Sequence, residues 1–112
     1  MTSLDPEEWA ELGHAKPLAE MVQDYTGIAR DSGMAGVVVA AGEVAAAHRL
    51  WPAGRLVVPG IRWPGGAIED QRRVGTPEAV IAHGATDLVL GRSLWDCEDP
   101  AERLRALLRE NP

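Results

Sequence analysis

The sequence lacks three features that would assign it to a special class of protein. Its single cysteine, Cys97, excludes an internal disulfide and fits a reducing compartment. No apolar stretch approaches the roughly 20 residues that a membrane helix needs, and the first residues do not have the pattern expected of a signal peptide. Positive charge is also scarce: the net charge of -6 argues against general affinity for nucleic acid or anionic membranes. These absences predict a soluble, cytoplasmic protein that binds neither nucleic acid nor membranes.

The residues that are present suit one small domain spanning positions 1–112, because 46% are hydrophobic and 25% are charged. Three helices are expected to start at Asp5, Thr76 and Asp99, since each precedes a proline at the first helical position. Further helices are expected over residues 17–30 and 43–50. Short apolar runs at 37–39, 56–58 and 88–90 are expected to be buried strands, and residues 1–4 could be the stump of a fourth.

Continuously apolar strands that alternate with helices predict a parallel sheet covered by helices. Residues 32–40 also resemble residues 83–91, each being a helix stop, a tight turn and a buried strand. Three or four strands are too few to close a barrel, which normally has eight. The open edges and the uncovered apolar face need a partner, because exposing that face to water costs on the order of 10 kcal/mol of folding free energy. We therefore expect a homo-oligomer, most simply a dimer.

The chemistry of such sheets is carried by the loops that follow the strands. Arg62 and Arg92 follow consecutive predicted strands, so the two side chains should lie side by side. A guanidinium group presents a rigid fork of donors that suits phosphate oxygens. Gly91 lets the backbone come close to a ligand. The alternative is that both arginines form ordinary surface ion pairs, but the arrangement favours a phosphate site.

Other polar and aromatic residues have simpler explanations. The three histidines (His14, His48 and His83) have no ligand spacing with one another or with Cys97, so no metal site is expected. The acidic residues Asp96 and Glu98 are expected in a solvated loop, and Asp70 in a turn. The four tryptophans (Trp9, Trp51, Trp63 and Trp95) are expected to pack in the interior, although Trp63 lies in the ligand loop and could be exposed.

Several motifs carry a resemblance to a known family. They are Pro-Gly-Ile-Arg at 59–62, Asp-Gln-Arg-Arg at 70–73 and Gly-Arg at 91–92, in that order, together with TSLDPEEWAELG at 2–13. In these motifs and their spacing the chain resembles the C-terminal half of bacterial orotidine 5'-phosphate decarboxylase. The resemblance covers essentially the whole chain but half of the family's barrel. It implies an α/β fold that is half of a (β/α)8 TIM-type barrel, with three to four parallel strands alternating with helices.

The resemblance also implies roles for individual residues. Arg62, Gln71 and Arg92 would hold the phosphate of a nucleotide, with a backbone amide from Gly91. Thr2 would approach the pyrimidine or the ribose, and Ser3 would assist it. These roles predict a site for phosphate or a nucleoside monophosphate such as uridine 5'-phosphate.

The family consists of lyases of pyrimidine biosynthesis that need no cofactor. Their catalytic lysines and aspartates lie in a D-x-K-x-x-D segment upstream of the part that this chain resembles, and a homodimer would not restore that segment. We therefore expect no catalytic residue here and no decarboxylation by this chain alone. Two alternatives remain open: a self-assembling structural half-barrel with vestigial binding, and a fragment that works beside a separate N-terminal half.

Overall fold

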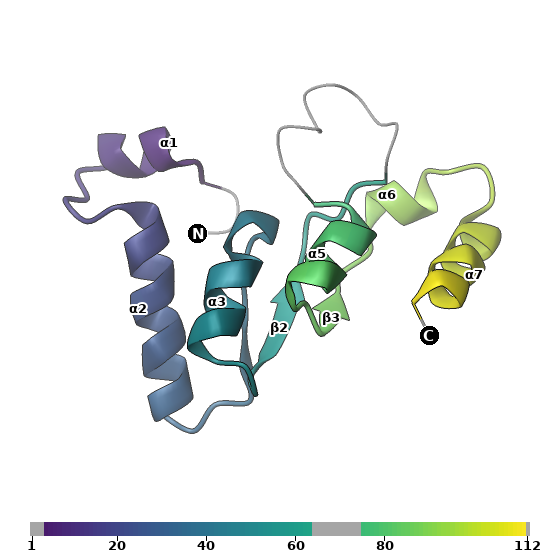
Figure 1. The fold of residues 1–112 in the computed structure, drawn as a ribbon. Coiled ribbons are helices and arrows are strands. Elements are labelled where there is room, and N and C mark those ends of the chain that lie inside the picture. The colour runs from purple at the N-terminus through teal and green to yellow at the C-terminus, as the bar shows by residue number, and fades with distance from the viewer. Residues whose placement is uncertain (1–3, 64–74, 112) are drawn as a thin grey trace.

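The structure is a computed structural model that describes residues 4–63 and 75–111 (Figure 1). Thr2, Ser3 and Gln71, three of the residues implicated in ligand binding, lie outside the described residues. The elements follow in the order α1 (Pro6–Glu11), α2 (Leu18–Asp31), β1 (Gly36–Val38), the 3-10 helix η1 (Ala41–Glu43), α3 (Val44–Leu50), β2 (Arg55–Val58), α5 (Pro77–His83), β3 (Asp87–Leu88), α6 (Arg92–Trp95) and α7 (Pro100–Glu110).

Three helices begin at the capping residues that the sequence indicates. The Asp5 carboxylate accepts the Glu8 amide at 2.8 Å, and the Glu8 carboxylate accepts the Asp5 amide at 3.2 Å, which completes a capping box before α1. The side chains of Thr76 and Asp99 accept backbone amides in the first turns of α5 and α7. At the other end of α5, Gly84 has a φ of 116°, the left-handed conformation that ends helices. Local side-chain chemistry therefore fixes these helix ends.

The three strands form one parallel sheet in the order β1-β2-β3. In its register Val37 lies opposite Leu56, and Val58 lies opposite Leu88. The pairing continues past β3, because the Val89 amide donates to the Val58 carbonyl at 2.9 Å. Parallel strands that alternate with helices confirm the predicted α/β half-barrel. None of the helices in the described part of the chain is both long enough and apolar enough to cross a membrane.

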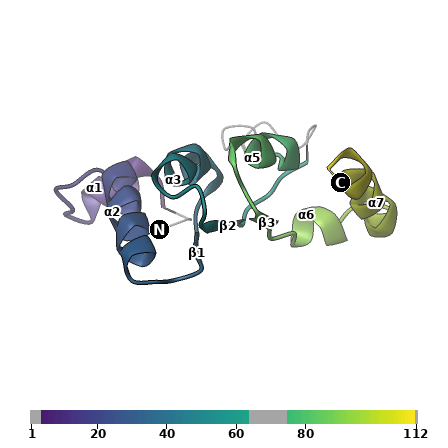
Figure 2. The same cartoon turned by 60° about the horizontal axis from the view of Figure 1, so that its bottom comes forward.

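Helices α2, α3 and α5 lie on one side of the sheet (Figures 1 and 2). Between them and the strands is the hydrophobic core, which consists of Val39, Val44, Ala47, Leu56, Val58, Ile61 and Val80. Each of these side chains is at most 3% exposed. At about 25 cal/mol per Å² of apolar surface, burial of these residues is the main term that holds the helices on the sheet.

The opposite side of the sheet carries apolar side chains that no described element buries. Side chains alternate between the faces of a strand, so Val38 and Val57, which are paired in the register, point away from the helices. Val38 is 61% exposed and Val89 is 48% exposed. An ion pair between Arg55 and Asp87 lies at the start of the same face. We call Val38, Val57, Val89, Arg55 and Asp87 the open face.

The structure differs from the sequence-based expectations in two helical segments and in two tryptophans. The helix expected at 43–50 is in fact α3, preceded by the separate 3-10 turn η1, and a short helix that was not predicted, α6, begins at Arg92. Trp95, expected to pack in the interior, is 70% exposed, because α6 turns Leu94 inward instead. Trp63 is half-buried and packs against the core, so it is not an exposed stacking platform.

Candidate functional site

The candidate site lies where β2 and β3 end, because the two parallel strands deliver their loops to the same edge of the sheet. Ile61 follows β2 and Ser93 follows β3. The Ser93 hydroxyl Oγ donates to the Ile61 carbonyl oxygen at 2.8 Å. This hydrogen bond joins the residue directly before Arg62 to the residue directly after Arg92. The two loops that carry the predicted phosphate-binding arginines are therefore in direct contact.

The loop after β2 is held in place on both sides of Arg62. The Ile61 side chain is 1% exposed and belongs to the core. The Arg62 amide donates to the Gly75 carbonyl at 2.8 Å, which brings Gly75, two residues before α5, back to the end of β2. The Arg62 side chain itself lies at the surface. A buried neighbour and a fixed backbone thus hold the exposed residue Arg62 at this edge, where its Nη1 atom lies 3.5 Å from the Ile61 carbonyl oxygen.

The segment after β3 presents Gly91 and Arg92 in a similar way. Leu94 is 5% exposed and anchors α6, whereas Gly91 and Arg92 lie at the surface. The amides of Leu94 and Trp95 both donate to the Gly91 carbonyl, which fixes the turn. A Cβ atom added at Gly91 would meet none of the described residues within 4 Å, its two chain neighbours aside, so they leave the space above this backbone open. A ligand can therefore approach Gly91 closely.

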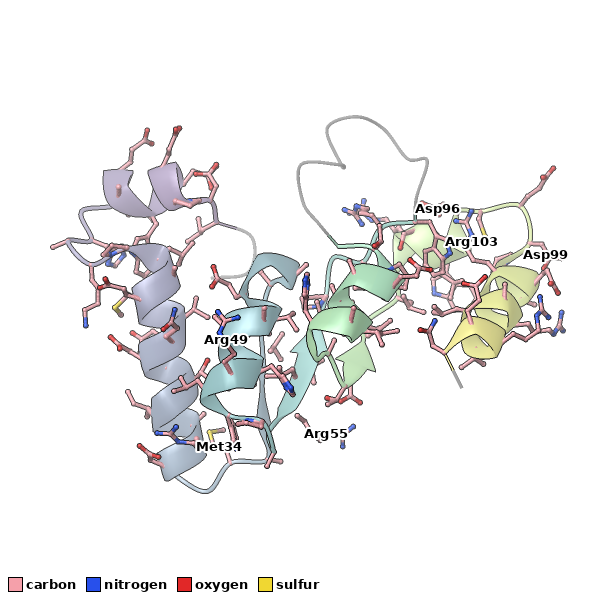
Figure 3. All side chains as sticks on the ribbon, viewed as in Figure 1. Met34, Arg49, Arg55, Asp96, Asp99 and Arg103 are labelled. Atoms are coloured by element: carbon pink, nitrogen blue, oxygen red, sulfur yellow. The ribbon has the colours of Figure 1, made fainter. Side chains whose placement is uncertain are left out.

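Sequence reasoning missed Arg103, which lies on α7 and reaches back to both loops (Figure 3). Its Nη1 atom donates to the Ser93 carbonyl at 3.1 Å. Its Cζ atom lies 5.0 Å from the centroid of the Trp63 ring, the geometry of a cation–π contact. Forty positions separate Trp63 from Arg103 in the sequence, and no local pattern indicates such a contact.

Among the predicted site residues, the structure places Arg62, Gly91 and Arg92 at one edge of the sheet. Gln71, Thr2 and Ser3 are the predicted residues outside the described part. The described residues contain no group of three or more His, Cys, Asp or Glu side chains that could hold a metal ion. Within the described residues, then, the candidate site consists of two exposed arginines and a glycine backbone, which suits an anion.

Comparisons with known proteins relate the chain to one family. A sequence model of the orotidine 5'-phosphate decarboxylase / HUMPS family matches residues 1–107. The orotidine 5'-phosphate decarboxylase of Methylobacterium sp. (strain 4-46) is 41% identical over 98% of this chain and 47% of its own length. That of Laribacter hongkongensis is 44% identical over 96% of this chain and 44% of its own length. The chain spans about half the length of the curated relatives it matches.

Solved structures show the same relationship. The crystal structure of orotidine 5'-phosphate decarboxylase from Lactobacillus acidophilus superimposes with a TM-score of 0.77 and 27% identity, over 100% of this chain and 46% of that one. The crystal structure of an uncharacterized conserved protein from Geobacillus kaustophilus gives a TM-score of 0.73 and 29% identity, over 98% and 45% of the two chains. Both matches agree with half of a barrel.

Proposed function

The chain belongs to the orotidine 5'-phosphate decarboxylase / HUMPS family, and we propose that it forms the phosphate-binding part of such a protein. The ligand is phosphate or a nucleoside monophosphate, with uridine 5'-phosphate as the representative of the pyrimidine class. The observation that carries this proposal is the hydrogen bond from Ser93 Oγ to the Ile61 carbonyl. It ties the side chain of Ser93, next to Arg92, to the backbone of Ile61, next to Arg62, which supports the assignment of both arginines to one site.

Two arginines at one edge suit a phosphate group for electrostatic reasons. A phosphate oxygen accepts charge-assisted hydrogen bonds from guanidinium donors, which are about twice as strong as neutral ones. Gly91 adds an approachable backbone amide, because it has no side chain to hold the ligand away. In the proposed complex Gln71 also contacts the phosphate, and Thr2 and Ser3 contact the nucleoside.

Calorimetric titration of the purified chain tests the proposed binding. We expect uridine 5'-phosphate to bind and uridine, which has no phosphate, to bind far more weakly. Arg92→Ala should cost about 2–3 kcal/mol of binding free energy, the value of a hydrogen bond to a charged group. Arg49→Ala is the matched control, because Arg49 is an exposed arginine on α3, on the helix side of the sheet (Figure 3). Equal binding of uridine and uridine 5'-phosphate, or equal effects of the two variants, would contradict the proposal.

We further propose that this chain alone does not decarboxylate orotidine 5'-phosphate. Residues 1–112 contain no D-x-K-x-x-D segment, and their single lysine is Lys16. The Lys16 ammonium pairs with Asp24 at 2.7 Å on the surface of α2, away from the ends of β2 and β3. Binding energy at a phosphate lowers a barrier only if other groups act at the reacting centre. Turnover that survives removal of the host enzyme and disappears in Arg92→Ala would overturn this statement.

The open face favours a second function, assembly with another copy of the chain. Two copies together have about the length of one curated relative, and each would cover the exposed Val38 and Val89 of the other. The Arg55–Asp87 pair puts both signs of charge on this face, so a copy related by a twofold axis can meet opposite charges. The occupant that we propose is therefore a second copy, which makes a homodimer.

Light scattering at micromolar concentration tests the assembly. We expect at least twice the chain mass of 12.0 kDa. A monomer that binds a hydrophobic dye would contradict the homodimer and would point to a separate N-terminal half as the occupant of the open face. A monomer that binds no dye would show that the face is not apolar in solution.

A further inference from the structure

Arg103 differs from the other arginines of α7 in the residues that its guanidinium group contacts. Arg105 and Arg109 are 66% and 63% exposed and both pair with Glu102, one of the first residues of the same helix. Arg103 is half-buried, and its guanidinium group contacts residues outside the helix: Nη1 donates to the Ser93 carbonyl, and Cζ lies over the Trp63 ring. The two kinds of contact are chemically distinct. An exposed pair within one helix has little structural effect, whereas Arg103 joins α7 to segments that follow two different strands.

The contacts of Arg103 close a ring of interactions around the two phosphate-binding arginines. One link of the ring runs from Ser93 Oγ to the Ile61 carbonyl. The next runs from the Ser93 carbonyl to Arg103 Nη1, and the last from the Arg103 guanidinium to the Trp63 ring. Ile61 and Trp63 flank Arg62 in the sequence. The ring therefore holds both neighbours of Arg62 and the residue directly after Arg92.

Arginine suits this position because its guanidinium group is planar. It can donate a hydrogen bond in its plane while its face lies on an aromatic ring. A lysine ammonium is a point charge that can donate to the Ser93 carbonyl but has no flat face for Trp63. Arg103 makes both a hydrogen bond to the Ser93 carbonyl and a cation–π contact with Trp63, which a residue serving only as a positive charge would not need.

We propose that Arg103 is a positioning residue for the phosphate site: it sets the spacing between the loop that carries Arg62 and the helix that carries Arg92. The proposal rests on the proposed phosphate binding and assigns Arg103 no contact with the ligand. A phosphate that binds both guanidinium groups needs a fixed spacing between them. If the two arginines are mobile before binding, ordering them costs binding free energy. Loss of Arg103 should therefore weaken phosphate binding without removing either binding arginine.

Three variants of the full chain test this role. Arg103→Ala removes the contacts with Ser93 and Trp63. Arg103→Lys keeps the charge and a donor for the Ser93 carbonyl but loses the planar guanidinium group over Trp63. Arg109→Ala is the matched control, because it removes the same charge from the same helix without touching either loop. Two measurements are made on each: amide hydrogen exchange of residues 59–63 and 91–95 without ligand, and calorimetric titration with inorganic phosphate and with uridine 5'-phosphate.

We expect Arg103→Ala to exchange faster in both segments and to bind both ligands about tenfold more weakly. Arg103→Lys should lie between Arg103→Ala and the wild type, and Arg109→Ala should change affinity less than twofold. If Arg103→Ala does not fold, the comparison of Arg103→Lys with Arg109→Ala decides in the same way.

Three results would overturn the assignment. A lower melting temperature with unchanged affinity would mean that Arg103 is only structural. Equal losses in Arg103→Ala and Arg109→Ala, with full rescue by lysine, would mean that only its charge matters. Unchanged exchange in both segments would mean that the ring does not hold the loops. A wild-type chain that binds neither ligand, while Arg103→Ala still exchanges faster, would instead refute the proposed function and support the link.

Discussion

Val38, the last residue of β1, and Val39, the residue directly after it, give a direct measure of whether the open face is covered in solution. Val38 points away from the helices and is 61% exposed, whereas Val39 points into the core and is 3% exposed. The two changes Val38→Ala and Val39→Ala remove the same atoms from adjacent positions of the chain. Differences in propensity and in the unfolded state therefore largely cancel, and what remains reports the burial of each side chain.

The structure sets the expected sizes. Each change removes the equivalent of two methylene groups, worth about 1.6 kcal/mol when fully buried. At Val39 the cavity left in the core adds to this value, so Val39→Ala should lower the free energy of unfolding by about 2–3 kcal/mol. At Val38 only about two fifths of the side chain is buried in a single copy, so Val38→Ala should cost about 0.6 kcal/mol in the monomer. If a second copy covers the open face, that cost should rise towards the value for Val39.

The assay is urea unfolding of both variants at two protein concentrations, one below and one above the midpoint of association. Val39→Ala should cost about the same at both, because the core is present in each copy. Val38→Ala should cost little in dilute solution and distinctly more in concentrated solution, where mass action couples association to stability. Equal costs for the two valines in dilute solution would refute the orientation of β1. A Val38→Ala cost that stays small at high concentration would refute the open face as the interface.

Three further predictions follow from single residues. Gly84→Ala should lower the free energy of unfolding by about 1–3 kcal/mol in thermal melts, because φ is 116° and the new Cβ would lie 2.5 Å from His48 Cγ; an unchanged melting temperature would refute the left-handed cap. Hydrogen bonds from Arg55 and then from Thr86 hold the pKa of Asp87 below its usual value, so its stabilising contribution is present above about pH 4 and is lost as the pH falls further. Asp87→Asn should therefore be less acid-sensitive in unfolding experiments, and an identical pH profile would contradict the pair. Ser93→Ala should cost about 1 kcal/mol of stability, since it removes the donor to the Ile61 carbonyl, whereas Ser32→Ala, at an exposed position, should be neutral in the same melts.

The elements that could be predicted from the sequence are those with local chemical causes. Asp5, Thr76 and Asp99 each cap a helix through a bond to an amide three residues away, and a proline follows each of them. The strands are short apolar runs between turns, so their existence and parallel order were also predictable. The ends of β3 could not be predicted in this way: the apolar run spans residues 88–90, whereas β3 is Asp87–Leu88. The ends of a strand depend on its hydrogen-bonding register with the neighbouring strand, and this register cannot be read from one apolar segment of the sequence.

The features that escaped prediction depend on contacts between distant segments. Helix α6 has four residues, too few to show a helical period, and it forms because Leu94 is buried while the Gly91 carbonyl accepts two amides. That turn also exposes Trp95, against the general rule that tryptophan packs inside. The contact of Arg103 with Trp63 and Ser93 spans two loops and a helix. The sequence could indicate Arg62 and Arg92 as candidate phosphate-binding residues, but not the contacts of Arg103 with the segments beside them.

The fold separates the proposed phosphate site from the open face. The edge that carries Arg62 and Arg92 is fixed by contacts that all lie within this chain: the Ser93–Ile61 bond, the Arg62–Gly75 bond and the Arg103 contacts. The open face, by contrast, starts at Arg55 and Asp87 and has no described cover. In this arrangement the proposed phosphate site would stay ordered whether or not a second copy covers the open face. Because Arg62 and Arg92 lie at the ordered edge, we expect phosphate binding to survive the substitution of any open-face residue that leaves the fold intact.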